Sequence, residues 1–445
     1  MKLALQSDMA ITNDDVRQLD RSYVFHSWSM QGNLNPMVIA GAKGCELWDY
    51  EGNTYLDFSS QLVNVNIGYQ HPRVLAAMKA QLDELVTIAP ATANLARGEA
   101  AKRIVELAPK GFSKVFFTNA GADANENAIR MARMYTGRDK VFSAYRSYHG
   151  NTGSAIAATG DWRRVPNEYS RGHVHFFNPY LYRSEFNATT EEEECARALA
   201  HLRRMIEVEG PNAIAAILLE SVPGTAGILV PPKGYMKGVR ELATEFGIML
   251  ILDEVMAGFG RTGKWFAFEH DDIVPDLITF AKGVNAGYVP AGGVLISEAI
   301  SHYFDDHFFA GGLTYSGHPL AMAAIVATID AMKEEKVVEN AAAMGDGVLR
   351  PGLEALAAKY PLIGEVRGVG LFQALELVTC REKRTPVSAA DMGAIKKALV
   401  DAGLIPFVVE NRIHVVPPCT VSAGQIQQGL AIFDSVLAQF TGLVK

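Results

Sequence analysis

The middle of the chain alternates short apolar runs with longer segments of helical periodicity. Seven runs rich in Val, Ile, Leu and Phe have the length of strands, at residues 114–118, 140–144, 173–177, 215–220, 248–253, 277–281 and 292–296. Continuous apolar runs are typical of parallel strands that are buried on both faces, and the helical segments supply the crossovers between them. We therefore predict an α/β fold with a mostly parallel, seven-stranded sheet.

The two ends of the chain follow a different pattern. Residues 44–57 predict a β-hairpin that turns at Gly52-Asn53, and a long helix is predicted over residues 319–335. Helices mixed with short strands, such as 366–377 and 412–416, complete the chain. We predict a small α+β domain built from both ends, with the following division: 1–65 as an N-terminal segment of the small domain, 66–325 as the large domain, and 326–445 as the C-terminal part of the small domain.

Length and charge narrow the class of protein. A chain of 445 residues with 49% hydrophobic residues is long enough for two cores. Its net charge of −8 would repel a phosphate backbone, and it contains no run of Lys and Arg, so nucleic acid is not an expected partner. The apolar stretch in residues 1–8 is too short for a signal peptide, and no segment has the about 20 apolar residues of a membrane span. We expect neither export nor a membrane.

The cysteines give no sign of a metal site or of disulfides. Cys45, Cys195, Cys380 and Cys419 are widely scattered and show no CxxC spacing. This usage fits a reducing compartment, and we predict a cytoplasmic protein.

Two strand ends carry reactive side chains. Asp253 ends the run 248–253, and Lys282 directly follows the run 277–281. A lysine amine can condense with an aldehyde, and a carboxylate can hold the protonated nitrogen of a heteroaromatic ring. Together they favour pyridoxal phosphate as the cofactor.

A third strand end is suited to a phosphate group. Thr118 is followed by Asn-Ala-Gly121-Ala122 and by a helix to about Tyr135, so the free N–H groups of the first helical turn would face a ligand above the strand. Every doubly wound protein has similar strand-to-helix turns, and the residues alone leave both readings open.

A fourth strand end brings aromatic groups. Tyr148 and His149 follow the run 140–144, and either ring could stack on a cofactor ring, although a half-buried loop aromatic would show the same sequence. The conjunction of four such strand ends favours the ligand, because open α/β sheets bind ligands at their carboxyl edge.

A nucleotide-binding loop is the competing interpretation. The stretch from Gly258 to Lys264 satisfies most of the P-loop pattern, and Asp253 resembles a magnesium-binding acid. Trp265, however, stands where a hydroxyl is required, and the loop follows the acidic strand instead of preceding it. We interpret residues 258–263 as a structural loop tied down by Arg261.

The ordered motifs resemble those of class III aminotransferases, which are fold type I pyridoxal phosphate enzymes. The resemblance covers residues 48–418 and is carried by five stretches, at 119–126, 148–150, 253–263, 282–283 and 313–319. It implies the large and small domains of that fold, and Lys282 and Asp253 as the catalytic pair. It also implies a homodimer with the active site at the subunit interface. A tetramer built from two such dimers is the alternative.

The same resemblance implies roles for further residues. Gly121 and Ala122 would hold the phosphate, Tyr148 and Val255 would contact the two ring faces, and Thr314 would reach the phosphate of the neighbouring subunit. His149 belongs to the same cofactor site. Glu220 resembles the family's strand-end acid near the cofactor oxygen, and an ordinary acid at a strand end remains the alternative.

Departures from the family pattern bear on the substrate. Met256, Ala122 and Thr225 stand where Gln, Ser and a second acid are common, which shifts the resemblance toward the amine:pyruvate group. Stretches 23–28 and 60–68 look most like taurine:pyruvate and related ω-amino acid aminotransferases. The expected substrate-binding residues are Phe25, Trp28, Val63, Tyr148 and Arg412, with Gln61 nearby.

Arg412 is the candidate for the acceptor carboxylate. It shares one strand face with His414, which stands nearer the position of the family's arginine, and an outward-facing Arg412 is the alternative.

The sequence thus predicts a transaminase that moves an amino group from an ω-amino acid or primary amine to pyruvate. The alternatives are an aminomutase or decarboxylase on the same fold, an aminotransferase of the 4-aminobutyrate/2-oxoglutarate type, and a non-catalytic cofactor-binding protein.

Overall fold

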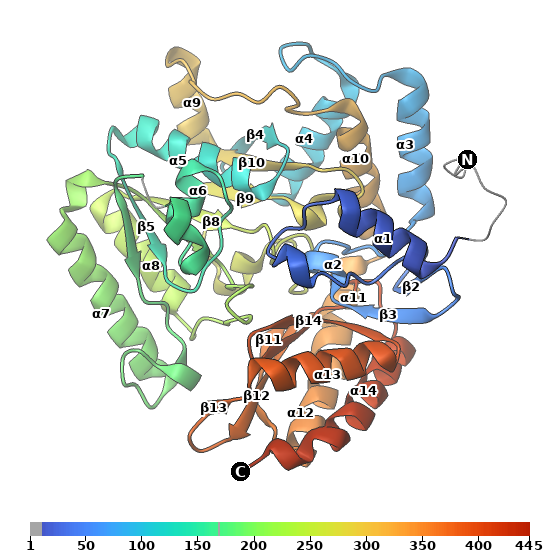
Figure 1. The fold of residues 1–445 in the computed structure, drawn as a ribbon. Helices are drawn as coiled ribbons and strands as arrows, with labels where there is room; N and C mark the ends of the chain where they lie inside the picture. Colours follow the sequence, from blue (N-terminus) through green and yellow to red (C-terminus); the bar gives the residue numbers. More distant parts are fainter. Residues whose placement is uncertain (1–10, 168–169) are drawn as a thin grey trace.

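The computed structural model describes residues 11–167 and 170–445, and its centre is a seven-stranded sheet (Figure 1). The strands are β4 (Phe112–Thr118), β5 (Lys140–Ala144), β6 (His173–Phe176), β7 (Ile214–Glu220), β8 (Met249–Asp253), β9 (Leu277–Phe280) and β10 (Gly292–Ser297). Their spatial order is β4-β10-β9-β8-β7-β5-β6. All seven predicted strands are present, with ends that differ from the prediction by two residues at most.

Only β10 runs against the other strands of this sheet. It pairs antiparallel with β4 and β9, whereas β6, β5, β7, β8 and β9 pair in parallel. The prediction of a mostly parallel sheet is therefore confirmed. The parallel arrangement brings the carboxyl ends of these strands to one edge.

Helices cover both faces of this sheet, which explains the continuous apolar runs. Alternate side chains of the strands enter two separate cores: Ile251 and Leu277 pack with α5, while Leu250 and Leu252 belong to the larger core on the other face. The helices of this part are α3 (Pro72–Glu84), α4 (Leu95–Leu107), α5 (Gly121–Thr136), α6 (Gly153–Ala158), α7 (Glu191–Glu209), α8 (Tyr235–Phe246), α9 (Glu298–Asp306) and α10 (Pro319–Glu334). Because these strands are buried on both faces, they lack the alternating polar side chains of a strand with one face in solvent.

A second sheet lies beside the first and combines strands from both ends of the chain. Its order is β1-β2-β3-β14-β15-β12-β11, with β13 paired to β12. The strands are β1 (Gly41–Lys43), β2 (Glu46–Trp48), β3 (Thr54–Phe58), β11 (Ile363–Val369), β12 (Phe372–Cys380), β13 (Thr385–Pro386), β14 (Leu404–Val409) and β15 (Arg412–Val415). Parallel pairing of β3 with β14, in which Leu56 lies opposite Leu404, joins the two ends.

The predicted hairpin and the predicted long helix are both present. β2 and β3 pair antiparallel around the turn at Gly52-Asn53, and α10 covers the segment predicted as a long helix. The prediction of one strand over residues 366–377 is wrong. This segment lies in the hairpin of β11 and β12, which turns at Gly370 with a φ of 56°. The predicted division near residue 326 falls within α10, and the three-part division stays a prediction.

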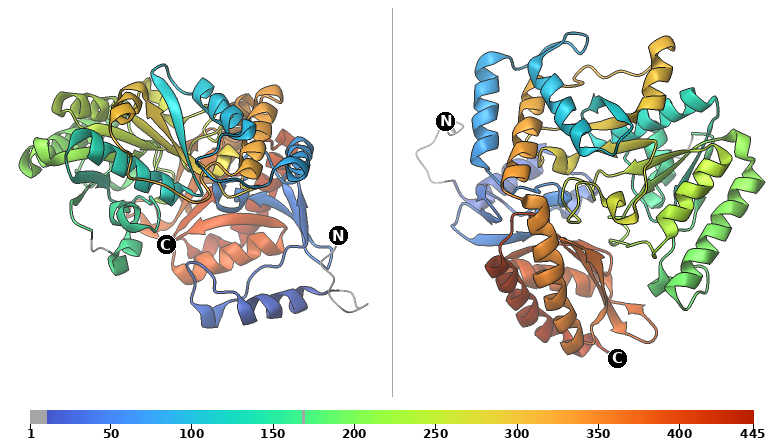
Figure 2. Two further views of the ribbon diagram at one scale, coloured as in Figure 1. Left: turned by 90° about the horizontal axis from the view of Figure 1, so that it is seen from above. Right: turned by 180° about the vertical axis from the view of Figure 1, so that it is seen from behind.

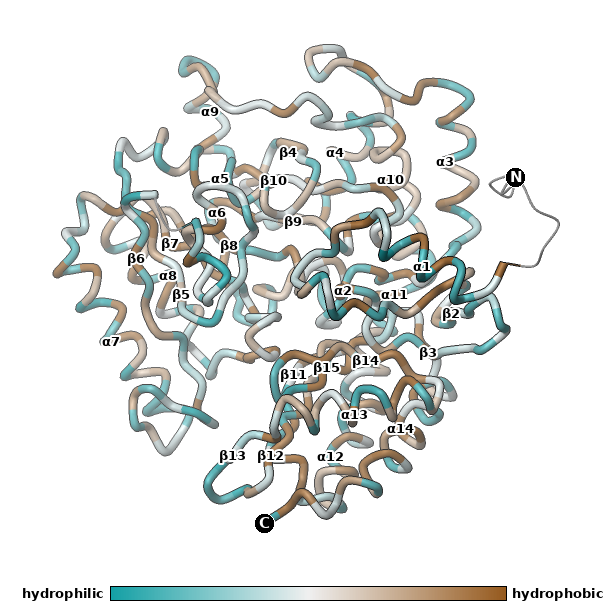
Figure 3. The backbone as a smooth tube through the Cα atoms, viewed as in Figure 1, coloured by the Kyte–Doolittle hydropathy of each residue, from teal (hydrophilic) through white to brown (hydrophobic). Residues whose placement is uncertain are grey.

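The remaining helices belong to the N- and C-terminal parts of the chain. They are α1 (Asn13–Tyr23), α2 (Ser60–Val63), α11 (Val337–Met344), α12 (Arg350–Lys359), α13 (Ala389–Asp401) and α14 (Ala423–Leu437). Figure 2 shows α1 standing away from the rest of the chain, and Figure 3 shows apolar positions gathered around β11, β14 and β15 while α1 carries many hydrophilic ones. Among residues 11–167 and 170–445 no helix combines the length and apolar character needed to cross a bilayer. The expectation on residues 1–8 lies outside the described residues.

The glycine-rich segment 258–263 is a structural loop, as predicted. Arg261 is fully buried in it and donates hydrogen bonds to the carbonyl oxygens of Leu371 and Pro417. It also donates to Ser60 Oγ at 3.2 Å and to Asn66 Oδ1 at 2.9 Å. One guanidinium thereby connects the loop to segments from both ends of the chain.

Candidate active site

Three acidic or hydroxyl side chains form one row across the carboxyl edge of the large sheet. Glu220 ends β7, Asp253 ends β8, and Thr279 lies in β9; the sheet register pairs Glu220 with Asp253 and Asp253 with Thr279. All three are buried. The strand ends predicted from sequence thus converge, and Asp253 lies between its two neighbours.

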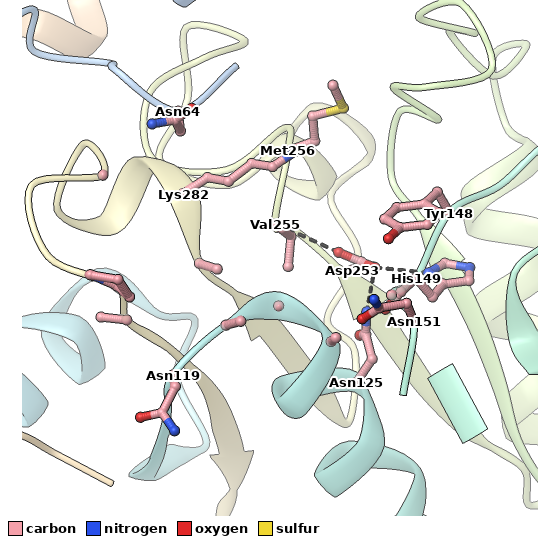
Figure 4. A pocket seen from close by; sticks show the side chains of 18 of the residues that line it. Asn64, Asn119, Asn125, Tyr148, His149, Asn151, Asp253, Val255, Met256 and Lys282 are labelled. Atoms are coloured by element: carbon pink, nitrogen blue, oxygen red, sulfur yellow. Dashed lines mark hydrogen bonds and ion pairs between the residues drawn. The ribbon is translucent and has the colours of Figure 1, made fainter. Parts of the chain in front are cut away.

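Three donors fix the orientation of the Asp253 carboxylate (Figure 4). Oδ2 accepts hydrogen bonds from Asn125 Nδ2 at 2.7 Å and from His149 Nδ1 at 2.8 Å. Oδ1 accepts one from the backbone N–H of Val255 at 3.0 Å. Because each carboxylate oxygen has two lone pairs, Oδ1 keeps one for a further N–H donor.

Asn125 is itself held in a single orientation. Its Nδ2 also donates to the carbonyl oxygen of His149 at 2.8 Å, and its Oδ1 accepts a hydrogen bond from the Thr279 hydroxyl at 2.7 Å. The amide is satisfied only in this orientation, since its NH₂ group faces two acceptors and its oxygen faces a donor. Thr279, Asn125 and His149 therefore form a rigid support for Asp253.

Lys282 follows β9 after Ala281 and has a strained backbone. Its φ of 42° lies in the left-handed region, which non-glycine residues adopt at a cost of about 1–3 kcal/mol. Burial lowers the pKa of Lys282, while the carboxylates of Glu220 and Asp253 act in the opposite direction. A larger fraction of this amine is therefore uncharged than for an exposed lysine, which favours nucleophilic and base chemistry.

Glu220 is buried between loops that shape the site. Its carboxylate accepts hydrogen bonds from the backbone N–H groups of Tyr148, at 3.1 Å, and Gly224, at 2.8 Å. Burial raises the pKa of Glu220 to about 6, with His149 lowering it and Asp253 raising it. This carboxyl group fixes the loop that carries Tyr148.

The N-terminus of α5 forms the floor of the site. No side chain caps this 16-residue helix at Ala120, so its first N–H groups are available to an anion. The approach is close: a Cβ on Gly121 would lie 2.9 Å from the methyl groups of Val255, and one on Gly150 would lie 2.4 Å from Cβ of Ala122. Small residues are therefore required at these two positions.

These groups surround one cavity of about 470 Å³. Eight of the residues expected to bind the cofactor line it: Gly121, Ala122, Tyr148, His149, Glu220, Asp253, Val255 and Lys282. Trp28 also lines it and contacts the Tyr148 ring edge-on, with ring centres 6.4 Å apart. Nine of the residues expected at the site thus line the same cavity.

Four expected site residues do not line this cavity. Phe25 is 85% exposed, Thr314 is exposed in the segment between α9 and α10, and Val63 is buried in a separate apolar cluster. Arg412 pairs with Glu410 and lies against Gly227. The structure leaves their proposed contacts to substrate or to a neighbouring subunit untested.

Several lining residues were missed by the sequence reasoning, namely Ser27, Asn64, Asn119, Asn125, Asn151, Thr225, Met256 and Asn285. Thr225 and Met256 had been noticed only as departures from a pattern. Asn125 lies four residues into α5, and its contact with Asp253 depends on how α5 packs on β8 and β9. No local sequence signal reveals that contact.

The residues present fit pyridoxal phosphate. The uncapped N-terminus of α5 suits its phosphate, Oδ1 of Asp253 has a free lone pair for its ring N–H, and Lys282 supplies the amine for its aldehyde. The His149 ring is hydrogen-bonded to Asp253 through Nδ1, and its Nε2 is a buried nitrogen without a partner among the described residues.

Comparison with known proteins agrees with this chemistry. The family model described as aminotransferase class-III matches residues 29–437. The chain is 33% identical to taurine–pyruvate aminotransferase from Bilophila wadsworthia over 87% of each chain, and 33% identical to putrescine–pyruvate aminotransferase from Pseudomonas aeruginosa over 98% of this chain and 99% of that one. A solved taurine:2-oxoglutarate aminotransferase from Bifidobacterium kashiwanohense, in complex with PLP and glutamate, superposes with a TM-score of 0.94 at 44% identity, covering 97% of this chain and 99% of the other.

Proposed function

Because the chain belongs to the class III aminotransferases, which are fold type I enzymes that depend on pyridoxal phosphate, we propose that it transfers an amino group from an ω-amino acid or primary amine to pyruvate. The proposed cycle has two stages, so that the donor product leaves before the acceptor binds. The observation that carries the proposal is the convergence of Lys282, Asp253 and the α5 N-terminus on one cavity.

We assign the catalytic roles to Lys282 and Asp253. When bound, pyridoxal phosphate supplies an aldehyde that captures amines and a ring that spreads negative charge from an adjacent carbon. Lys282 Nζ, with its lowered pKa, takes a proton from the donor carbon and returns it as a general acid. Asp253 Oδ1 would hold the proton on the ring nitrogen, and Asn125 and His149 keep this carboxylate in place.

The other cofactor residues act by shape and orientation. Gly121 and Ala122 would hold the phosphate through backbone N–H groups, and Val255 and Tyr148 would contact the two faces of the ring. Glu220 keeps Tyr148 in position through its hydrogen bond to the Tyr148 backbone N–H. Trp28 lines the cavity beside the Tyr148 ring and is expected to contact the substrate.

The acceptor has a second candidate, 2-oxoglutarate. The solved relative with 44% identity is named for that acceptor and was obtained with glutamate, whereas the relatives from Bilophila wadsworthia and Pseudomonas aeruginosa, each 33% identical, are named for pyruvate. A panel of donors against both acceptors in steady-state assays distinguishes them. A higher kcat/KM with pyruvate supports our proposal, and a strong preference for 2-oxoglutarate overturns the acceptor assignment.

The reaction class has its own test. The loaded protein is mixed with excess amine and no acceptor, and the visible absorbance of the bound cofactor is followed. A stable conversion to the aminated cofactor, reversed by a keto acid, supports transamination. An unchanged spectrum across the amine panel, or product release without an acceptor as for a decarboxylase or aminomutase, contradicts it.

We also propose a homodimer in which Thr314 contacts the phosphate of the neighbouring subunit. The segment around Thr314 carries exposed apolar side chains, with Phe308 88% and Tyr315 64% exposed, which an interface would cover. Measuring the mass of the protein in solution tests the homodimer and also distinguishes a dimer from a tetramer. A cytoplasmic location remains a prediction, supported by four cysteines that are all free.

A further inference from the structure

The turn at residues 223–229 forms one wall of the cavity. It follows β7, and its half-buried Thr225 lines the cavity. Gly224 of this turn donates a backbone hydrogen bond to Glu220 at 2.8 Å. A Cβ on Gly224 would lie 2.0 Å from Sδ of Met256, which also lines the cavity. A displacement of this turn would therefore move the wall beside which a substrate binds.

The backbone of this turn is strained. Two consecutive residues have positive φ, with 121° at Gly227 and 58° at Ile228. A β-branched residue in the left-handed region is an outlier, and such a conformation persists only where the surrounding contacts fix it. The N–H groups of Gly227 and Ile228 donate to the carbonyl oxygen of Gly224, at 2.9 and 3.0 Å. The fully buried Ile228 side chain adds apolar contacts, and a further contact comes from outside the turn.

Arg367 supplies this contact from the second sheet. It lies in β11, and its Nε donates a hydrogen bond to the carbonyl oxygen of Gly227 at 2.7 Å. The approach is close, since a Cβ on Gly227 would lie 2.6 Å from Nη2 of Arg367. The Arg367 side chain is only 8% exposed, so water competes little for this bond. A side chain of the second sheet therefore fixes the middle of a turn that follows a strand of the first.

The guanidinium of Arg367 is itself held in one orientation. Its Nη1 donates to Glu376 at 2.9 Å and to Glu365. Its central carbon lies over the Tyr180 ring, 5.1 Å from the ring centre. The Tyr180 hydroxyl is within hydrogen-bond distance of the same two carboxylates, at 2.7 Å for Glu376 and 2.9 Å for Glu365. Because these contacts fix its plane, Arg367 presents Nε to Gly227 in a defined direction.

We propose that Arg367 is a positioning residue of the active site, which fixes the cavity wall at Thr225 through the Gly227 carbonyl. The contact also acts on Tyr148, because Glu220 accepts backbone hydrogen bonds from both the turn and Tyr148. Displacement of a positioning group lowers the rate even when it arises far from the reacting atoms. The role in substrate binding rests on the proposed transaminase function. The alternative is that Arg367 only neutralises the two buried glutamates.

Arg367→Lys separates these two roles. Lysine keeps a positive charge beside Glu365 and Glu376, but it lacks the planar fork that also reaches Gly227. Tyr180→Phe is the matched control, because it removes a hydroxyl from the same glutamates, keeps the ring beside Arg367 and leaves the Gly227 contact in place. Gly227→Ala disturbs the contact from the other side, since the added Cβ meets Arg367 and a φ of 121° is unfavourable for alanine.

The first measurement is hydrogen exchange of the full chain, loaded with pyridoxal phosphate and analysed by mass spectrometry. Peptides covering residues 222–229 and 145–151 are compared with the reference segment 319–334 in α10. In Arg367→Lys and Gly227→Ala, exchange in residues 222–229 should rise about tenfold, because one hydrogen bond from a charged donor is lost. Exchange in residues 145–151 should rise as well, and the reference segment should not. Tyr180→Phe should change all three segments less than about twofold.

The second measurement separates KM from kcat. With an amine donor that the parent protein accepts, Arg367→Lys should raise the donor KM about three- to tenfold, whereas Tyr180→Phe should leave it unchanged. A loss of folded protein lowers the amount of active enzyme but does not change KM. The increase in KM therefore distinguishes a moved cavity wall from a general loss of stability.

Three outcomes would overturn the assignment. Unchanged exchange in either active-site segment of folded Arg367→Lys would show that the turn does not depend on this contact. Equal increases in Tyr180→Phe, or in the reference segment, would reduce Arg367 to a support of the fold. Faster exchange in the turn with an unchanged KM would exclude a role in substrate binding. A parent protein that reacts with no amine refutes the proposed function instead, and hydrogen exchange still decides whether Arg367 fixes the turn.

Discussion

Removing the guanidinium of Arg261 is expected to destabilise the fold without touching the cavity. Arg261 donates four hydrogen bonds, to Leu371, Pro417, Ser60 and Asn66. At about 1.5 kcal/mol for each bond from a charged donor, these sum to about 6 kcal/mol. Removing a fully buried charge returns a few kcal/mol of lost solvation, and the net cost of Arg261→Met is therefore about 3 kcal/mol.

This cost converts into a measurable shift of the melting temperature. An unfolding entropy of about 2.1 cal/mol/K per residue gives about 0.9 kcal/mol/K for a cooperative unit of 445 residues, so the expected decrease in Tm is about 3 °C. A smaller cooperative unit would give a larger decrease. Arg261→Lys should be at least as destabilising, because it keeps a buried charge but cannot reach four acceptors in a fixed plane.

Differential scanning calorimetry of the cofactor-free protein measures the effect. Arg204, which is 75% exposed and pairs with Glu207 at 3.6 Å, provides the matched control, and Arg204→Met should change the stability by less than about 0.5 kcal/mol. A Tm for Arg261→Met within the range of this control would refute the reasoning, since it would mean that the buried bonds only balance the cost of burying the charge.

Three further predictions concern the site and its surroundings. Asn125→Asp places a carboxylate against Asp253 Oδ2, so cofactor affinity at pH 8 should fall about tenfold and recover in part at lower pH, where a proton can bridge the pair; a fluorescence titration in which the affinity is independent of pH would contradict this. Burial raises the pKa of Glu254 to about 7 from an unfolded value near 4.5, so the folded protein retains a proton that the unfolded chain loses, and stability should decline by about 3 kcal/mol as pH rises through this window. Glu254→Gln should flatten the decline in Tm between pH 5 and 8, and an equally steep decline in this variant would count against the assignment. Thr314→Ala should leave the solution mass unchanged and weaken cofactor binding about 3- to 10-fold, whereas an unchanged affinity would show that Thr314 does not reach a phosphate.

The seven strands of the large sheet could be predicted because burial on both faces makes each of them a continuous apolar run. The hairpin at Gly52-Asn53 could also be predicted, since its turn residues are typical of that geometry. β11 and β12 were merged because the turn at Gly370 has only two residues and lies within an apolar stretch. A single glycine there gives little local signal of a change in direction.

The reactive residues could also be predicted, because their positions at strand ends bring them to one edge of a parallel sheet. Asn125 could not, since its contact with Asp253 depends on how α5 packs on the sheet. Thr314 is the opposite case. The family resemblance suggests its role, but its expected partner belongs to another subunit. A single chain places such a residue on the surface without testing its role.

The parallel pairing of β3 with β14 also sets the order in which the chain can fold during synthesis. At about 5–20 residues per second, the ribosome needs roughly 20–70 s to produce Leu404 after Leu56, and until then β3 lacks the neighbour on its inner edge. All strands of the seven-stranded sheet emerge within this interval. A nascent chain therefore carries an unpaired strand edge for most of its time on the ribosome, and early release near residue 400 would leave that edge permanently open to aggregation.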